Sequence, residues 1–308
     1  MSAGPVVLLG PTASGKSTLA MEIAKGGDGI EIVAVDSMQV YRGMDIGTAK
    51  PTAADQAAVR HHGIDLAAPS EDFTVTRYRA AFDDAMATIQ QRDGVALLVA
   101  GTGLYLRAVT DRLVMPGRWP NVRAELEADP DTAALHTQLA QLDAVAAARM
   151  EPNNRRRIVR ALEVTLGSGR PFSSFGAGLT TYPSTQFRFI GLDVDPAELR
   201  SRIAARLDAM LAAGLVAEVE GLAARMSRTA RQALGYRELL AHLDGETSLD
   251  EAIDLIRRRT VTFARRQRAW FRRDPRVEWR KPVEVAPLVL GDWGRCHAPS
   301  TRDSATRS

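Results

Sequence analysis

The chain has 308 residues, of which 45% are hydrophobic, so it is long enough for one large domain or two smaller ones. Its formal net charge of +3 is too small to indicate a partner, and its single cysteine excludes an internal disulfide and a cysteine-based metal site. No stretch of about 18 apolar residues is present and no signal-peptide pattern precedes the first strand, so we expect a cytoplasmic protein without a membrane span.

The first hundred residues alternate between strand and helix patterns. Short apolar runs at residues 6–9, 30–35 and 95–100 predict three buried strands. Helical patterns follow the first strand and cover residues 73–91. This alternation favours an α/β fold in which helices flank a parallel sheet.

The pattern changes in the middle of the chain. Residues 122–167 are alanine-rich and helical, without any strand run, and a loop rich in Gly, Ser, Pro and Thr follows. A strand returns at residues 187–194, before helices that continue to about residue 273 and a short strand at 276–279. The chain beyond Pro282 is rich in turn-forming residues. The expected organisation is an α/β core of residues 1–115 and 185–281, a helical insertion at 116–184, and a flexible tail at 282–308.

A glycine-rich loop follows the first strand. It matches the pattern GxxxxGK followed by Ser or Thr, and comprises Gly10, Pro11, Thr12, Ala13, Ser14, Gly15, Lys16 and Ser17. The glycines let backbone N–H groups point inward at an anion, and the next helix offers its positive N-terminal end. Lys16 would reach phosphate oxygens, and the Ser17 hydroxyl would bind Mg²⁺. Kinases, hydrolases and diphosphate-releasing transferases all use such loops.

Asp36 directly follows the second predicted strand. Ligands bind beyond the carboxyl ends of parallel strands, so we expect Asp36 near the phosphate loop, as a Mg²⁺ ligand, a general base or a structural cap. The third strand instead ends in Gly101, Thr102 and Gly103, with no acidic residue. This argues against a typical nucleotide hydrolase, which holds its metal with an aspartate at that point.

Two arginine clusters occur later in the chain. Residues 257–281 contain 11 basic residues, and Arg258, Arg265 and Arg272 recur at seven-residue spacing, with Arg268 between them, on one expected helix face. A second cluster lies at residues 155–160. Each could be an ordinary solvated helix face, but two clusters beside a phosphate loop favour contact with an RNA backbone. Phe263, Trp270 and Phe271 are expected in the core.

The chain resembles the bacterial type of the tRNA dimethylallyltransferase family, also called tRNA isopentenyltransferases. The resemblance spans residues 10–274 and is carried by the segments GPTASGKS, VDSMQVYRGMDIGTAKP, AGTGLYLRAV, NNRRRIVRALEV, QALGYREL and FARRQRAWFRRD. It implies a P-loop NTPase-like α/β fold with a helical insertion that binds tRNA. Arg156 departs from the family pattern, where glutamine is expected, which puts tRNA affinity rather than the chemistry in doubt.

The resemblance also implies a reaction. Dimethylallyl would pass from dimethylallyl diphosphate to N6 of the adenine at tRNA position 37, just 3′ of the anticodon, and diphosphate would leave. Mg²⁺ would assist, and ATP would not be consumed. The substrates would be the anticodon stem-loops of tRNAs that read codons beginning with U, and the enzyme would act as a monomer without a membrane.

Residue roles carry over from the family by matching position. Asp36 would be the general base, the loop from Gly10 to Ser17 would hold the diphosphate with Lys16, and Ser17 would bind the metal. Thr102 would line the channel where the substrates meet, and Arg202 would stabilise the leaving group, with Arg200 and Arg206 as alternatives. The residues expected to contact tRNA are Asp36, Ser37, Met38, Gln39, Thr102, Arg123, Arg156, Arg157, Ile158, Val159, Arg160, Gln232, Gly235, Tyr236 and Arg237.

Two other functions remain open on the sequence. A small-molecule or nucleoside kinase would explain the phosphate loop and Asp195-Pro196 followed by Arg200, Arg202 and Arg206. A noncatalytic RNA-binding protein with a relic phosphate loop would explain the arginine clusters. A kinase would need neither the insertion nor those clusters, and a plain binder would not need Asp36 at a strand end.

Overall fold

A six-stranded, wholly parallel sheet forms the centre of the computed structural model, which describes residues 4–176, 179 and 181–297. The strands are β1 (Val6–Leu9), β2 (Ile30–Val35), β3 (His61–His62), β4 (Val95–Ala100), β5 (Arg188–Leu192) and β6 (Val277–Arg280). Their order in the sheet is β3-β2-β4-β1-β5-β6. Val6 pairs with Leu97 on one side and Arg188 on the other. The expected α/β fold is confirmed, although sequence patterning missed the two-residue strand β3.

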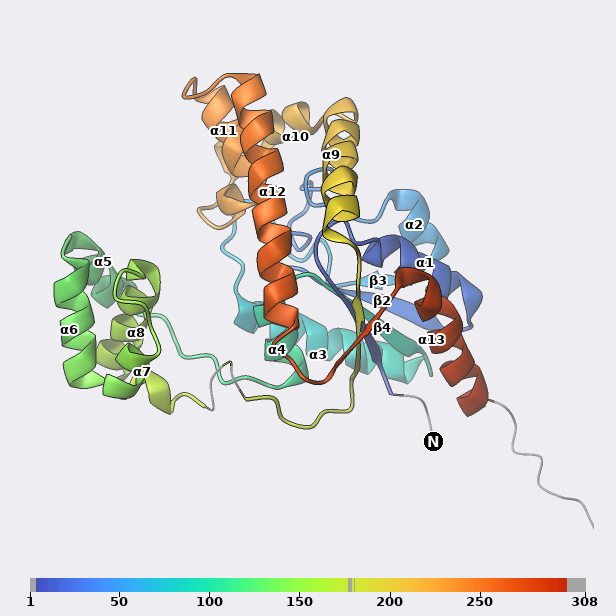
Figure 1. Ribbon diagram of the computed structural model, residues 1–308, viewed down its shortest axis with the longest axis horizontal. Coiled ribbons are helices and arrows are strands. Elements are labelled where there is room, and N and C mark those ends of the chain that lie inside the picture. Colours follow the sequence, from blue (N-terminus) through green and yellow to red (C-terminus); the bar gives the residue numbers. More distant parts are fainter. Residues whose placement is uncertain (1–3, 177–178, 180, 298–308) are drawn as a thin grey trace, which may run out of the picture. The chain divides into compact units, whose positions relative to one another are not determined.

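Alternate residues of the strands supply two hydrophobic cores, one on each face of the sheet. Val6 and Leu8 face a core shared with α1 (Lys16–Gly26) and α13 (Pro282–His297), which contact each other (Figure 1). Val7 and Leu9 face the opposite core. Helices cover both faces, which is why the strands read as continuous apolar runs rather than as alternating ones.

The second face carries most of the helices that build the site. It is covered by α3 (Val75–Gln91) and α4 (Gly103–Thr110), and then by α9 (Pro196–Ala212), α10 (Leu215–Leu222), α11 (Tyr236–Leu243) and α12 (Leu249–Phe271). The helices α9 and α12 contact each other, and Figure 1 shows them running side by side. The 3-10 turns η3 (Ala223–Arg225) and η4 (Ala230–Gln232) also pack on this face. The short helix α2 (Ala53–Ala58) is followed by Val59, which is buried in the opposite core beside α1.

The segment from Pro282 to His297 is a helix, so the prediction of a flexible, turn-rich tail from residue 282 is wrong for these residues. Proline favours the first turn of a helix, where its missing N–H costs nothing, and Pro282 begins this one. Val285, Val289 and Trp293 are buried in the core beside α1, and this burial outweighs the proline at position 287. The remainder of the predicted tail, residues 298–308, lies outside the described residues.

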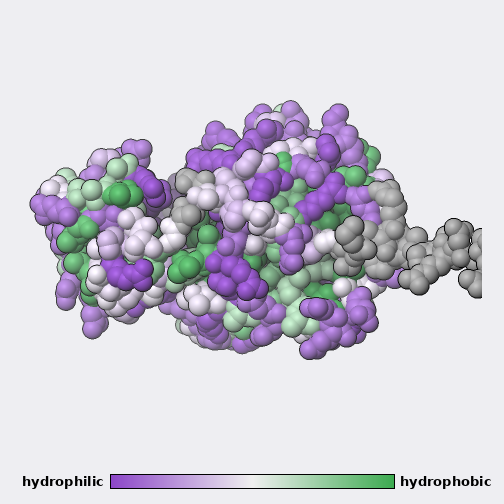
Figure 2. All heavy atoms as spheres, turned by 90° about the horizontal axis from the view of Figure 1, so that it is seen from below, coloured by the Kyte–Doolittle hydropathy of each residue, from purple (hydrophilic) through white to green (hydrophobic). Residues whose placement is uncertain are grey.

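The chain divides into two compact units. One comprises Met1–Thr110 and Ser184–Ser308, and the other comprises Asp111–Pro183. The smaller unit contains α5 (Pro120–Ala128), α6 (Thr132–Leu142), α7 (Ala144–Ala148), α8 (Arg155–Ser168) and the 3-10 turn η1 (Phe172–Ser174). It has a core of its own around Leu135, Leu139 and Leu162. On the face drawn in Figure 2, hydrophilic residues cover most of each unit and hydrophobic ones form small patches. Within the described ranges, no helix is both long enough and apolar enough to cross a bilayer.

Candidate active site

The phosphate loop lies between β1 and α1, where the sequence places it. Ala13 (φ 62°) and Gly15 (φ 90°) adopt left-handed backbone conformations, which turn the chain back on itself before α1 begins at Lys16. The hydroxyl of Ser14 is buried and has no hydrogen-bond partner in the described structure. A buried polar atom without a partner is costly, so this loop is suited to receiving a ligand with hydrogen-bonding oxygens.

Lys16 folds back over the loop. Its Nζ donates to the carbonyl oxygens of Gly10 at 2.9 Å and Pro11 at 2.7 Å. Burial is the main cause that lowers the pKa of Lys16 to about 7; the nearby charge of Arg206 also lowers it, while Asp36 acts in the opposite direction. An anion bound in the loop would favour the charged form of this side chain.

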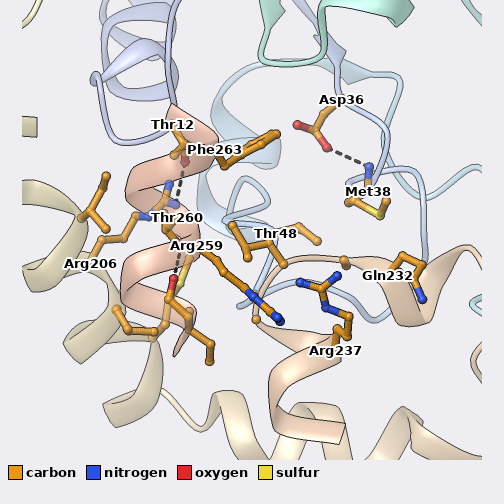
Figure 3. A pocket seen from close by; sticks show the side chains of 18 of the residues that line it. Thr12, Asp36, Met38, Thr48, Arg206, Gln232, Arg237, Arg259, Thr260 and Phe263 are labelled. Carbon is orange, nitrogen blue, oxygen red and sulfur yellow. Dashed lines mark hydrogen bonds between the residues drawn. The ribbon is translucent and has the colours of Figure 1, made fainter. Parts of the chain in front are cut away.

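Asp36 extends from the carboxyl end of β2 into the same cavity as the phosphate-loop residue Thr12 (Figure 3). Its Oδ1 accepts hydrogen bonds from the amides of Met38 at 2.8 Å and Gln39 at 3.3 Å. Its Oδ2 lies 3.4 Å from the position that a Cβ atom would take on Gly101, at the end of β4. The cavity holds about 480 Å³. The carboxylate is therefore fixed by one oxygen, and the side chain faces the space beside the phosphate loop.

Gln267 of α12 joins the phosphate loop to the end of β4. Its Oε1 accepts the Thr12 amide at 2.8 Å, and its Nε2 donates to the Gly101 carbonyl at 2.7 Å. No local sequence pattern could show these partners of Gln267, which lie 255 and 166 residues away. These two bonds fix α12 relative to both the loop and the strand.

Two arginines of α9 approach the phosphate loop. Arg206 donates to the Thr12 hydroxyl at 2.7 Å and lines the cavity, and burial lowers its pKa. Arg202 donates to the Ser14 carbonyl at 3.4 Å and pairs with Glu198 at 2.6 Å. Arg200 instead lines a separate shallow groove with Arg257, Arg258 and Arg265. Of the three candidates for the leaving group, Arg206 therefore faces the cavity that Asp36 also lines.

The opposite wall of the cavity carries two further arginines, both held by Glu238. Arg259 Nη1 lies 2.6 Å and Arg237 Nη2 lies 2.8 Å from its Oε1, while Oε2 accepts the Gly235 amide at 2.8 Å. Burial of Glu238 would raise its pKa, but the hydrogen bonds from Arg259, Arg237 and the Gly235 amide outweigh burial and lower it. The charged carboxylate thus holds both guanidinium groups at the cavity wall (Figure 3). Sequence reasoning missed Arg259 and Glu238.

The loop that follows Asp36 is held in place by Glu218 of α10. The carboxylate of Glu218 accepts three successive amides, those of Asp45 at 2.9 Å, Ile46 at 2.7 Å and Gly47 at 3.1 Å, as well as the Tyr236 hydroxyl. Gly47 packs so closely on the Tyr236 ring that a Cβ atom there would lie 2.4 Å from it. Gly47 and Thr48 consequently form part of the cavity wall.

Most of the expected tRNA contacts in the larger unit line this cavity, namely Asp36, Ser37, Met38, Thr102, Gln232, Gly235 and Arg237. Gln39 does not; its side chain donates to the carbonyls of Thr48 and Ala49 at 3.1 Å and braces the loop. Tyr236 is fully buried beneath that loop, so the expectation of a direct contact through its side chain is corrected.

The arginine face expected along α12 is only partly present. Arg258 and Arg265 line the shallow groove, but Arg268 and Arg272 both pair with Asp193, at 2.7 and 3.1 Å. Phe271 is buried and Trp270 packs against the core, as expected. Phe263 is not a core residue, since it is 37% exposed and lines the cavity.

In the smaller unit, the stretch expected to contact tRNA has some side chains that are buried and others that are exposed. Ile158 and Val159 are buried in the core of this unit, because α8 turns its apolar face inward, so direct contact through these side chains is also corrected. Arg156 and Arg157 are exposed.

Glu163, which is 1% exposed at its side chain, organises the remaining expected arginines of the smaller unit. It pairs with Arg160 at 2.9 Å and Arg123 at 3.2 Å and accepts the Trp119 amide at 3.0 Å. Arg160 also donates to the carbonyls of Pro116 and Gly117, both at 2.9 Å. Arg123 and Arg160 are therefore part of the internal structure of this unit.

Two protein-family models match the chain. The model described as "IPP transferase" matches residues 39–274, and the one described as "Isopentenyl transferase" matches residues 5–71. Among curated proteins, a tRNA dimethylallyltransferase of Geobacter metallireducens is 47% identical over 283 residues, which cover 89% of this chain and 91% of that protein. One from Kineococcus radiotolerans is 47% identical over 304 residues, which cover 92% and 95% of the two chains.

Solved structures with the same fold include a tRNA isopentenylpyrophosphate transferase from Bacillus halodurans. It is 36% identical, has a TM-score of 0.68, and the match covers 96% of this chain and 98% of that one. A eukaryotic dimethylallyltransferase described as acting on tRNA has a TM-score of 0.74 over 94% of this chain and 77% of its own, but at 23% identity it supports the fold alone.

Proposed function

The chain belongs to the IPP transferase family, its curated relatives include tRNA dimethylallyltransferases, and from this membership we propose the following reaction for it. The chain is a prenyltransferase of tRNA. In our proposal it transfers dimethylallyl from dimethylallyl diphosphate to N6 of the adenine at tRNA position 37 and releases diphosphate.

One observation carries the proposal: a carboxylate and a phosphate loop face one cavity. Asp36 and Thr12 both line it, and Arg206 contacts the loop from the same space. Two substrates held there would meet in a defined orientation, and such positioning can remove a large part of the barrier to a reaction between two bound molecules.

The chemical step that we propose is a substitution at the allylic carbon. The lone pair of N6 forms the new N–C bond as the C–O bond to diphosphate breaks, and the electron pair of that bond leaves with the diphosphate. Asp36 accepts the proton that N6 loses. Lys16, Arg206 and the loop amides stabilise the charge that develops on the departing oxygen, with Arg202 at the edge of the loop. Thr102 lines the space between the reactants.

Mg²⁺ suits this site as a partner of the diphosphate. The described residues contain no group of three His, Cys, Asp or Glu side chains that could hold a metal by themselves. Mg²⁺ commonly takes only one or two protein ligands and completes its shell with phosphate oxygens and water. We propose that the hydroxyl of Ser17, exposed at the start of α1, is a protein ligand, and the ion would neutralise charge on the leaving diphosphate.

We propose that the RNA partner is the anticodon stem-loop of tRNAs that read codons beginning with U. The target adenine would leave its stack and enter the cavity, where Gln232, Arg237 and Arg259 are placed to contact its neighbours. Arg156 and Arg157 would contact RNA phosphates from the smaller unit. We propose that the protein acts as a monomer, and its tRNA substrate makes the cytoplasm the proposed compartment.

The kinase alternative loses its support at this point. The curated relatives are named for transfer of dimethylallyl rather than of phosphate. A noncatalytic RNA binder is displaced for the same reason.

The direct test incubates the purified protein with radiolabelled dimethylallyl diphosphate, Mg²⁺ and unmodified tRNA. We expect label in the tRNA, at position 37 after nuclease digestion, with one diphosphate released for each group transferred. Label at another nucleotide would refute the position, and turnover of ATP on a small acceptor without label in tRNA would refute the reaction.

A further inference from the structure

Phe263 is an exposed aromatic side chain in a cavity that is otherwise polar, cationic and aliphatic. It is the sole aromatic residue among those described around this cavity, which also holds Asp36 and four arginines. The other two aromatic residues on α12, Trp270 and Phe271, pack into the core. Phe263 keeps 37% of its surface exposed while it lines the cavity, and a ligand with an apolar face would cover this remaining ring surface.

The position of this ring is fixed relative to the reacting groups. Phe263 and Gln267 are four residues apart on α12, so their side chains lie one above the other on the same helix face. Gln267 is bonded to the phosphate loop at Thr12 and to the end of β4 at Gly101. The ring is thus held one helical turn from the point where the loop, β4 and Asp36 come together.

We propose that Phe263 is the platform on which the extruded target nucleobase stacks. In Figure 3 the ring extends from α12 toward the side of the cavity occupied by Asp36. A purine lying against the ring would present its edge, and with it the exocyclic amine, toward that carboxylate. Stacking does not discriminate between bases, because every base has a π-face. In this arrangement Phe263 holds the base in place, and Asp36 selects the amine. This inference rests on the proposed function, since it assigns a residue to the same reaction.

The alternative is that the ring contacts the dimethylallyl group of the donor rather than the base. One substitution distinguishes these two roles. Phe263→Leu keeps an apolar side chain that can pack against a prenyl group but removes the π-face. Phe263→Tyr keeps the π-face. If the base stacks on the ring, the Phe263→Leu variant should be defective and the Phe263→Tyr variant active. If the ring holds the prenyl group instead, both variants should be active, or the KM for the donor should change.

The experiment measures binding of anticodon stem-loop RNA that carries either adenine or an abasic site at the target position. Wild type should prefer the adenine RNA by about 5- to 150-fold, the range expected for one stacked base. Phe263→Leu should lose most of this preference while it binds abasic RNA as wild type does, and Phe263→Tyr should keep it. The donor KM should be unchanged in both variants.

Two results would overturn the stacking role. One is an undiminished adenine preference in Phe263→Leu, which includes equal weakening on both RNAs, and the other is a raised donor KM with unchanged RNA binding. The binding measurement does not depend on catalysis. An adenine preference that is lost in Phe263→Leu, in a protein that transfers no prenyl group, would support stacking and refute the proposed reaction, so the two failures are distinguishable.

Discussion

The amide of Met38 donates to Oδ1 of Asp36 at 2.8 Å, so the carboxylate proposed as the general base also caps the turn that follows β2. The two roles belong to different oxygens, because Oδ2 is directed toward Gly101. Substitution by alanine would remove both roles at once. Substitution by asparagine can keep the capping oxygen and remove the basic one.

Asp36→Asn should therefore lose rate rather than binding. We expect the single-turnover transfer rate at saturating tRNA to fall by about 100-fold or more, the usual effect of removing a general base. The KM for tRNA should stay within about threefold of wild type, because the Met38 turn is retained, and the melting temperature should not change. A rate close to that of wild type would exclude Asp36 as the base.

The lowered pKa of Lys16 predicts a pH-dependent affinity for the donor. Its ammonium group is only partly charged near pH 7 in the free protein, and a bound diphosphate would raise its pKa. Binding should therefore take up a proton, and affinity should weaken by up to about tenfold per pH unit above about 7 through this group.

A matched control for this experiment is Lys16→Arg, which stays charged throughout. Titration calorimetry with a non-reacting diphosphate analogue between about pH 6 and 9 would measure both proteins, and the titration of the analogue itself is common to them. The same pH slope in both proteins would show that Lys16 does not titrate in this range.

The different surroundings of the α9 arginines predict different effects of removing them. Arg206→Ala should lower kcat and raise the KM for the donor, together costing about 10- to 1,000-fold in kcat/KM, because the leaving group would lose one of its charged donors. Arg200→Ala is the matched control on the same helix and should leave the donor kinetics unchanged, since Arg200 lines the separate groove. Equal effects of the two substitutions would exclude a specific role for Arg206.

Local patterns in the sequence were sufficient to predict the sheet apart from the short strand β3, the phosphate loop and the position of Asp36. Buried parallel strands are continuous apolar runs, and the loop is a contiguous motif whose glycines have a backbone reason. The carboxyl ends of parallel strands lie at one edge of the sheet, so Asp36 could be placed near the loop without coordinates.

Residues that hold the site together through distant partners were not predictable. Glu218 bonds amides more than 170 residues earlier in the chain, and Gln267 bonds Thr12 across 255 residues. Nothing in their local sequence distinguishes them from exposed polar residues. The helix α13 was missed for a related reason, because packing against α1 outweighs the turn-forming residues within it.

The Glu218 carboxylate should control the order of the loop after Asp36. Glu218→Ala removes the acceptor of three successive amides. A hydrogen bond to a charged group contributes roughly 1.5 kcal/mol or more, so we expect amide hydrogen exchange at residues 45–47 to become faster by about 10-fold or more. The KM for tRNA should rise while the KM for the donor does not.

Glu220→Ala provides a control for this prediction, because Glu220 is exposed on the same helix two residues away. It should change neither hydrogen exchange nor kinetics. Protection of residues 45–47 that persists in Glu218→Ala would mean that the loop is ordered by other interactions, such as those of Lys50 with Asp65 at 2.7 Å.

Neighbouring arginines at the start of α8 should differ in what they contribute. Arg155 donates to the carbonyls of Glu127 at 3.1 Å and Leu126 at 3.3 Å, and also to that of Asp129, whereas Arg156 and Arg157 are exposed. Replacing both exposed arginines by alanine should leave the melting temperature unchanged and weaken tRNA binding. The slope of log K against log salt should become shallower by about 0.7–0.9 for each RNA phosphate that the variant no longer neutralises. Arg155→Ala should instead lower the melting temperature of the smaller unit, because three carbonyls would be without their charged donor. An unchanged salt slope in the double variant would show that Arg156 and Arg157 do not contact RNA phosphates.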